Sequence, residues 1–266
     1  MNAYNPKLLI AGYGNIGKHI INEFNKFEFA IYDKYQDEFA NESVLEKHYD
    51  IAFVAVPTEM LPSGECDLSC INDIIGRIKA DTIVIKSAVP VGTFDNYPDN
   101  IIVSPEFYGT TQHSLEFPNF VVLGGNKKNA KKVAQLYYHV KTGDFKVIFV
   151  NQHTAELAKY MENCWIAAKV TFCNEFARIA KNVGVDYDDL RECFVADERV
   201  SPSHTFIYDE KPFYDSHCLN KDIPALIYDC EKKNIEVPFM NGVREANRQQ
   251  KQELLSKNSI KLEGGK

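Results

Sequence analysis

Short runs of apolar residues alternate with longer segments in which apolar residues recur every three or four positions over the first 150 residues. Short apolar runs predict buried strands, and the three-to-four spacing predicts helices with one apolar face. Strands are predicted at 7–11, 29–33, 51–56, 82–87, 101–103, 120–123 and 146–150, and helices at 17–24, 68–79 and 127–140. Strands alternating with helices indicate an α/β fold with a mostly parallel sheet covered on both faces.

The pattern changes after residue 150. Residues 154–183 contain no Gly or Pro, and their apolar residues recur at helical spacing, which predicts one helix of about 45 Å. Shorter helices are predicted at 187–193, 220–233 and 241–255, and the polar segment 256–266, which ends in Gly-Gly-Lys, is expected to be a flexible tail. We therefore expect an α/β domain at 1–150, a long connecting helix with a small all-helical domain at 151–255, and the tail.

Composition and charge exclude several classes of protein. The chain has 266 residues, of which 45% are hydrophobic, and a net charge of −7. These values are typical of globular proteins, and the acidic balance argues against a nucleic-acid partner. The absence of a long apolar stretch or a secretory signal argues against a membrane span and for a cytoplasmic protein. The seven cysteines are expected to be free thiols, and their spacing indicates no metal site.

The segment joining the first predicted strand to the first predicted helix has the spacing of a dinucleotide-binding turn. Its glycines allow a tight turn, close approach of a pyrophosphate to backbone N–H groups, and close packing of helix on strand. Asp33 ends the next strand, where a carboxylate accepts hydrogen bonds from ribose hydroxyls and repels a 2′-phosphate, so NAD is favoured over NADP. The adjacent Lys34 weakens that exclusion slightly. The predicted Rossmann-type site comprises Gly12, Tyr13, Gly14, Asn15, Ile16, Gly17, Asp33 and Lys34.

Further segments, in the same order along the chain, resemble the UDP-glucose/GDP-mannose dehydrogenase family. They are Val54-Ala-Val-Pro-Thr58, Lys86-Ser-Ala-Val-Pro-Val-Gly-Thr93, Ser104-Pro-Glu-Phe107, Ala155-Glu-Leu-Ala-Lys159-Tyr-Met-Glu-Asn163 and Cys218-Leu-Asn-Lys221-Asp222. The resemblance implies NAD-dependent oxidation of a nucleotide sugar, similar to UDP-glucose, from the C6 alcohol to the carboxylate. It also implies further cofactor-binding residues at Val56, Pro57, Thr58, Ser87 and Lys221.

The resemblance assigns roles to five catalytic residues. Cys218 is the nucleophile, because a thiolate adds to an aldehyde to give a thiohemiacetal, whose oxidation yields a thioester. Asp222 lies one helical turn later, and Lys221 or Lys159 is expected to lower the thiol pKa. Lys159 and Asn163, at i and i+4, stabilise the developing oxyanion. Glu106 is the general base that activates the hydrolytic water.

The sequence departs from the family pattern at several positions. Ala88 replaces a threonine, Asp215-Ser-His replaces the glycine-rich approach to Cys218, and Thr110 stands where a second carboxylate is usual. Family members are also about half as long again, with a third domain that helps to hold the nucleotide. We therefore expect weak activity on UDP-glucose with millimolar affinity, and Asp215 adds repulsion if it lies near the diphosphate. A smaller substrate, or a partner subunit that completes the site, remains open.

Two other functions remain open at this stage. A two-electron hydroxyacid dehydrogenase also joins a Rossmann domain to a helix with Lys-x-x-x-Asn, but needs neither Cys218 nor Glu106. A cofactor-binding protein without turnover is the other alternative. Counting NADH per sugar distinguishes the three functions. The long helix, which bears Trp165 and Phe172, is expected to form a homodimer, because a helix of this length needs partners on more than one face.

Overall fold

The first apolar run forms β1 (Leu8–Ala11), which lies between β2 (Phe29–Tyr32) and β3 (His48–Val54). The structure, a computed structural model, describes residues 4–108 and 118–263, with the side chains of 257–263 left out. Within these ranges the sheet has seven strands in the order β2-β1-β3-β4-β5-β6-β7. The remaining strands are β4 (Lys79–Ile85), β5 (Ile101–Val103), β6 (Phe120–Gly125) and β7 (Lys146–Val150).

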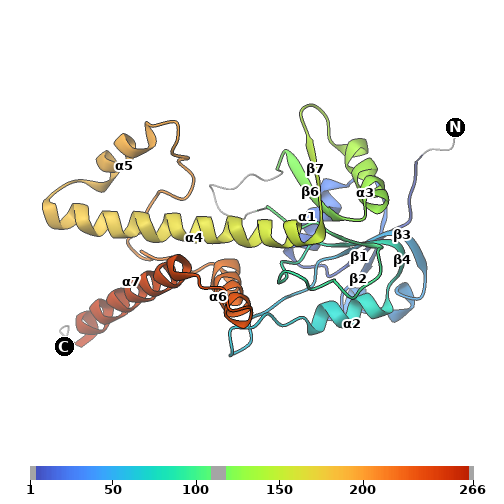
Figure 1. Ribbon diagram of the computed structural model, residues 1–266, viewed down its shortest axis with the longest axis horizontal. Coiled ribbons are helices and arrows are strands. Elements are labelled where there is room, and N and C mark those ends of the chain that lie inside the picture. The colour runs from blue at the N-terminus through green and yellow to red at the C-terminus, as the bar shows by residue number, and fades with distance from the viewer. Residues whose placement is uncertain (1–3, 109–117, 264–266) are drawn as a thin grey trace. The chain divides into compact units, whose positions relative to one another are not determined.

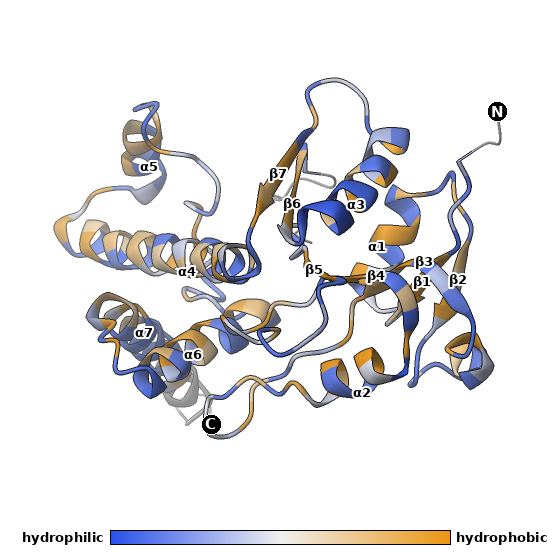
Figure 2. Ribbon diagram, turned by 45° about the vertical axis from the view of Figure 1, so that its right-hand side comes forward, coloured by the Kyte–Doolittle hydropathy of each residue, from blue (hydrophilic) through white to orange (hydrophobic). Residues whose placement is uncertain are grey.

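Neighbouring strands in this part of the chain are parallel, apart from the antiparallel pair β5 and β6. Successive residues of β1 point to opposite faces: Leu8 and Ile10 enter one hydrophobic cluster, and Leu9 and Ala11 enter the other. Helix α2 (Ser69–Arg77) covers one face, whereas α1 (Asn15–Glu23) and α3 (Lys127–Val140) cover the other (Figure 1). In Figure 2, α1 and α2 each have a hydrophobic and a hydrophilic side. The predicted α/β sheet is confirmed.

The strand order reverses at β1, whose two neighbours are reached by connections in opposite directions. Ala11 pairs with Tyr32 on one side and with Val54 on the other, so the carboxyl ends of the three strands lie level. Ligands of doubly wound sheets bind at such a reversal, beyond the carboxyl ends of the strands. The turn after β1 and the residues after β2 and β3 therefore meet where a ligand is expected.

The chain divides into two compact units. Among the described residues, the sheet unit comprises 4–61, 66–108 and 118–159, and the helical unit comprises 62–65 and 160–263. Helix α4 (Gln152–Val183) is the predicted long helix and runs through the boundary. The helical unit also contains α5 (Tyr187–Val195), α6 (His217–Lys232) and α7 (Pro238–Glu263). Its core is formed by residues of α4, α6 and α7, including Ala167, Ile223 and Val243.

Helices α6 and α7 each begin three residues earlier than predicted. Helix α6 begins at His217 rather than at 220, because the Ser216 hydroxyl accepts a hydrogen bond from the Leu219 N–H and caps the helix. Helix α7 begins at Pro238, a residue suited to the first helical position, and extends to Glu263, through most of the segment expected to be a flexible tail. That extension contains no Gly or Pro before residue 264. None of the described helices is both long and apolar enough for a membrane span.

Candidate cofactor and catalytic sites

The turn after β1 has a backbone suited to a pyrophosphate. Gly12 has φ +98°, and a Cβ built on it would lie 2.4 Å from the carbonyl oxygen of Ala55. A Cβ on Gly17 would lie 2.1 Å from the carbonyl oxygen of Gly12, so this glycine allows α1 to pack against the turn. A Cβ on Gly14 would have no neighbour within 4 Å. The open space lies at the N-cap of α1, where helix N–H groups bind phosphate, so the turn fits a dinucleotide.

The carboxylate of Asp33 is held at the end of β2 by backbone donors. Its Oδ2 accepts a hydrogen bond from the Tyr13 N–H at 2.7 Å, and its Oδ1 accepts one from the Tyr35 N–H at 2.8 Å. The Gln36 side-chain amide donates to Oδ2 at 3.1 Å and to the Tyr13 carbonyl at 3.0 Å. Asp33 is therefore fixed against the glycine turn. Asn15 and Ile16 are the first two residues of α1.

A hollow of about 350 Å³ lies beside Asp33 and belongs entirely to the sheet unit. Its lining includes the predicted residues Gly12, Asp33, Lys34, Val56 and Pro57, together with Tyr32, Tyr35, Ser69, Cys70, Asp73 and Ile74. The hollow has the position expected for the adenosine half of NAD, beyond β2 and β3.

Three of the five cofactor residues implied by the resemblance lie outside the lining of that hollow. The Ser87 hydroxyl donates to the Val56 carbonyl at 2.6 Å, and the Thr58 hydroxyl donates to the Ala88 carbonyl at 3.0 Å. These hydrogen bonds join the loops that follow β3 and β4. The third, Lys221, belongs to the helical unit and is paired there with Asp222.

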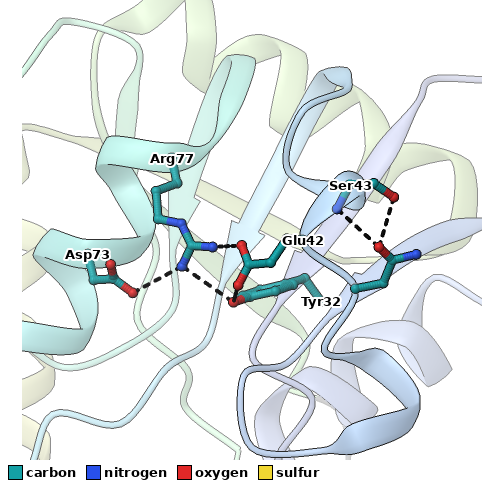
Figure 3. A network of polar contacts seen from close by, with 6 residues as sticks. Tyr32, Glu42, Ser43, Asp73 and Arg77 are labelled. Carbon is teal, nitrogen blue, oxygen red and sulfur yellow. Dashed lines mark hydrogen bonds and ion pairs between the residues drawn. The ribbon is translucent and has the colours of Figure 1, made fainter.

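Sequence analysis missed a polar network at the wall of the hollow (Figure 3). Tyr32 donates its hydroxyl hydrogen to Glu42 at 2.8 Å, and the Arg77 guanidinium pairs with both Glu42 and Asp73. Arg77 also lies over the Tyr32 ring, 5.5 Å from its centroid. The network joins β2, α2 and the short 3-10 helix η2 (Glu42–Val44). No sequence pattern signals it, because its members come from three separate segments.

Glu106 forms a buried ion pair with Lys86, the first residue of the segment Lys86–Thr93. The Lys86 ammonium lies 3.1 Å from Oε2 of Glu106, and the two side chains are 2% and 9% exposed. Oε1 of Glu106 accepts hydrogen bonds from the N–H groups of Phe107 and Tyr108. Burial is the largest single influence and opposes ionisation of Glu106. The Lys86 ammonium, together with His19 and the Tyr108 N–H, outweighs it and holds the pKa of this carboxyl below its ordinary value.

The first turns of α4 attach to the loops at the edge of the sheet. Buried Glu156 accepts a hydrogen bond from the Gly92 N–H at 2.8 Å, which fixes the predicted Val-Gly-Thr segment. The Lys159 ammonium lies 5.2 Å from the centroid of the Phe107 ring. Lys159 is thus next to the segment that carries Glu106, although the sequence does not place the two together.

In the helical unit, Asn163 and Asp222 are brought together. The Asn163 amide donates to Oδ2 of Asp222 at 2.6 Å, and the Lys221 ammonium lies 2.6 Å from Oδ1. Asp222 is 2% exposed, so its charge is compensated by these two partners. Cys218 lies one turn earlier in α6. The predicted proximity of the two residues on one helix is therefore present.

The thiol of Cys218 differs in setting from the core cysteines. Cys218 is exposed at the second residue of α6, where the positive end of the helix dipole favours negative charge. Cys164 is buried in the helical core, and burial raises its pKa to about 12. All seven cysteines are free. Cys70 has the same position in α2 but is half-buried, whereas Cys218 is exposed at its helix N-terminus.

The structure corrects the expected effect of Asp215. Its carboxylate accepts a hydrogen bond from the Asn220 amide at 2.8 Å and pairs with Lys211 at 3.0 Å and Lys251 at 3.2 Å. The amide hydrogen bond and Lys211 lower the pKa of Asp215 to about 2. Because two lysines balance this charge, Asp215 does not present the unpaired negative charge that repulsion of a diphosphate requires. Thr110, the other altered position, lies outside the described residues.

Two models of one protein family match this chain. Residues 15–141 match the NAD binding domain of the UDP-glucose/GDP-mannose dehydrogenase family, and residues 153–249 match its central domain. A UDP-glucose 6-dehydrogenase from Rickettsia conorii is 26% identical over 273 residues, which cover 92% of this chain and 62% of the relative. The chain thus spans about 60% of that relative's length.

Solved structures share the fold. A UDP-glucose dehydrogenase from the archaeon Pyrobaculum islandicum has a TM-score of 0.78 at 21% identity, covering 93% of this chain and 69% of that one. A 3-hydroxyisobutyrate dehydrogenase from Mycobacterium tuberculosis has a TM-score of 0.67 at 14% identity, covering 91% and 92%. At these identities the likeness shows the fold alone, whereas the two domain matches together span most of the sequence. The resemblance read from the motifs is confirmed, and the chain belongs to the UDP-glucose/GDP-mannose dehydrogenase family.

Proposed function

We propose that this chain carries out NAD-dependent oxidation of the C6 alcohol of a nucleotide sugar, similar to UDP-glucose, to the carboxylate. The observation that supports this most directly is the arrangement on α6. An exposed thiol at the helix N-terminus precedes by one turn a buried carboxylate that holds the Asn163 amide. A two-electron alcohol dehydrogenase has no use for such a thiol.

The residues of the chain divide the chemistry between them. The glycine turn and Asp33 hold NAD, which supplies the hydride acceptor for both oxidations. The substrate alcohol loses its O–H proton to water, Lys159 and Asn163 stabilise the resulting alkoxide, and loss of hydride from C6 gives the aldehyde. The same two residues then stabilise the oxyanion of the adduct. The Cys218 thiolate forms a C–S bond with the aldehyde to give a thiohemiacetal, and loss of hydride from that carbon leaves a thioester.

The last step is hydrolysis. Glu106 takes a proton from water as the oxygen adds to the thioester carbon, the C–S bond breaks, and the Cys218 thiolate is released with the carboxylic acid. Asp222 is assigned to holding Asn163 in position, since the two are hydrogen-bonded at 2.6 Å. Lys221, bound to the other oxygen of Asp222, compensates its charge.

Counting NADH tests the proposal. Incubation with limiting UDP- or GDP-sugar should yield about two NADH per sugar and an acid product. One NADH per sugar would place the chain with the two-electron hydroxyacid dehydrogenases, whose fold is also similar. No NADH with a panel of sugars, despite NAD binding, would favour a cofactor-binding protein without turnover.

We also propose a homodimer formed through α4. Several large apolar side chains of this helix are exposed to solvent. Their exposed fractions are 73% for Met161, 62% for Trp165, 48% for Phe172, 41% for Phe176, 46% for Ile179 and 67% for Val183. Their spacing of three, four and seven residues is that of one helix face. Burying such a face against a second copy is expected to contribute about 25 cal/mol per Å² of apolar area.

Sedimentation velocity tests the dimer. The wild type should sediment as a dimer of about 60 kDa, twice the 30.3 kDa chain. Trp165→Lys combined with Phe172→Asp should give a folded monomer, whereas the exposed Tyr138→Lys, on α3, should leave the dimer intact. A monomeric wild type at micromolar concentration would contradict the proposal.

A further inference from the structure

Lys86 and Glu106 lie at a functional edge of the sheet unit. Lys86 directly follows β4, and Glu106 lies three residues after the end of β5, a parallel neighbour of β4. Both therefore lie beyond the carboxyl ends of strands, on the edge where sheets of this kind bind their ligands. The Lys86 ammonium also lies 3.5 Å from the Ser104 hydroxyl. The pair is thus a buried polar cluster at the edge that carries the cofactor turn.

Stability alone explains this pair poorly. Burying both charges costs several kcal/mol of hydration, and replacing such a pair by apolar residues is often neutral or stabilising. Perturbed, buried titratable groups at a ligand-binding edge are more typical of functional sites. The burial and position of the Lys86–Glu106 pair therefore indicate a functional role for Glu106.

The groups around Glu106 form a nearly balanced set of charges. Glu23 and Lys141 form a second ion pair at 2.7 Å, with side chains 5% and 16% exposed. His19 stacks on Tyr108 with the ring centroids 4.0 Å apart. The titratable groups that face Glu106 or its segment are Lys86 at the end of β4, His19 and Glu23 on α1, Tyr137 on α3, Lys141 after α3, and Lys159 on α4.

Burial fixes the protonation of the neutral members of this set. It lowers the pKa of His19 and raises that of Tyr137, so both stay uncharged near neutral pH. The two lysines of the ion pairs then balance the two glutamates. Lys159 is only half-buried, so removing the Lys86 charge would leave the Glu106 carboxylate without its adjacent buried cation. A proton taken up by Glu106 would remove that uncompensated charge.

We infer that Lys86 is a positioning residue for Glu106: its buried ammonium keeps this carboxylate ionised and oriented at the ligand-binding edge. The inference rests on the proposed function, in which Glu106 accepts a proton from water during thioester hydrolysis. A carboxylic acid cannot accept that proton, so a base buried to this degree needs a fixed cation beside it. Oε1 bound by two backbone N–H groups and Oε2 bound by Lys86 give the carboxylate one orientation.

A direct test measures the ionisation of Glu106 without turnover. Infrared difference spectra between each protein and its Glu106→Gln counterpart isolate the Glu106 carboxylate band. In the wild type and in Lys86→Arg the carboxylate should persist to below about pH 4. In Lys86→Met it should convert to the acid at a pH at least about two units higher. An unchanged titration in Lys86→Met would overturn the inference, whatever the chain catalyses.

A second test follows hydrolysis of the Cys218 thioester by intact-mass spectrometry across pH. Lys86→Met should slow hydrolysis at least about tenfold at pH 5 and leave it within about twofold of wild type at pH 9, where the base ionises without its lysine. A role confined to folding predicts an equal loss at every pH, which would contradict the inference. Absence of any NADH from the wild type would refute the proposed function, while the infrared titration would still decide the role of Lys86.

Discussion

Two helix N-termini in this molecule carry the predicted chemistry, and they are built in opposite ways. At the start of α1, the N-cap is Gly14, which has no side chain, and the space around it is open. At the start of α6, the Ser216 hydroxyl caps the helix, and Asp215 is bound by Asn220, Lys211 and Lys251. The N–H groups at the start of α1 have no side-chain cap, whereas at the start of α6 the Ser216 hydroxyl accepts one hydrogen bond, from the Leu219 N–H.

The difference shows how a helix N-terminus serves two kinds of site. An open N-terminus binds an anion that comes from outside, because four N–H groups lack partners within the helix. A side-chain-capped N-terminus instead fixes the residues of the first turn, which here include Cys218. The α6 turn is therefore suited to holding a reactive thiol rather than to binding a phosphate.

The largest expected effect comes from the thiol itself. Cys218→Ala should abolish acid formation, a loss of at least about a thousandfold, because no other group can form the thioester. NAD binding, measured by calorimetry, should be unchanged, since the cofactor turn belongs to the sheet unit. Cys193→Ala, at another exposed thiol, is the matched control. Continued acid formation by Cys218→Ala would move the chain to the two-electron class.

Two of the three glycines of the cofactor turn, Gly14 and Gly17, should separate the effect on folding from the effect on NAD binding. Gly17→Ala places a Cβ 2.1 Å from a backbone oxygen and should lower the free energy of unfolding by about 1–3 kcal/mol. Gly14→Ala meets no atom within 4 Å and should leave stability within about 0.5 kcal/mol while weakening NAD binding. Chemical denaturation and calorimetry on both variants measure the two effects. Equal destabilisation by both would show that the α1 turn is not open.

Much of the framework could be predicted because its signals are local. The glycine turn between a strand and a helix, and the long helix without Gly or Pro, depend on neighbouring residues alone. The start of α6 was misplaced by three residues, since Ser216 was not recognised as an N-cap. Fixing this start matters, because it puts Cys218 within the first helical turn.

The partners of the site residues could not be predicted, because they come from distant parts of the chain. Glu156, on α4, accepts a hydrogen bond from the Gly92 N–H, 64 positions away. Lys86 and Glu106 are 20 positions apart and meet only because β4 and β5 are adjacent and parallel. The charge of Asp215 was judged without Lys251, which reaches it from α7.

Asp33 should set the preference for NAD over NADP. Its replacement should have a smaller effect on NAD binding than a change in the glycine turn. Asp33→Ala should weaken NAD binding by about tenfold, the effect of one lost charge-assisted hydrogen bond, and narrow the gap to NADP. Asp37→Ala, in the exposed segment that follows, is the control. Calorimetry with both cofactors measures the change. NADP binding as tight as NAD binding by the wild type would contradict the assignment of Asp33.

The smallest expected effect is at Asp215. Asp215→Ala removes the ion pairs and hydrogen bond that hold the loop leading into α6. The rate of Cys218 alkylation should therefore change by about two- to fivefold. The change is modest because the Asp215–Lys211 ion pair is partly exposed. Asp209→Ala, at an exposed carboxylate in the same segment, should not change this rate.

Because the pKa of Asp215 is lowered to about 2, the stabilisation that its carboxylate gives to the folded loop is present above the ordinary Asp range and is lost only as pH falls toward 2. The difference between the variants should therefore persist at pH 5. An identical alkylation rate in Asp215→Ala would show that the Ser216 cap alone fixes the thiol.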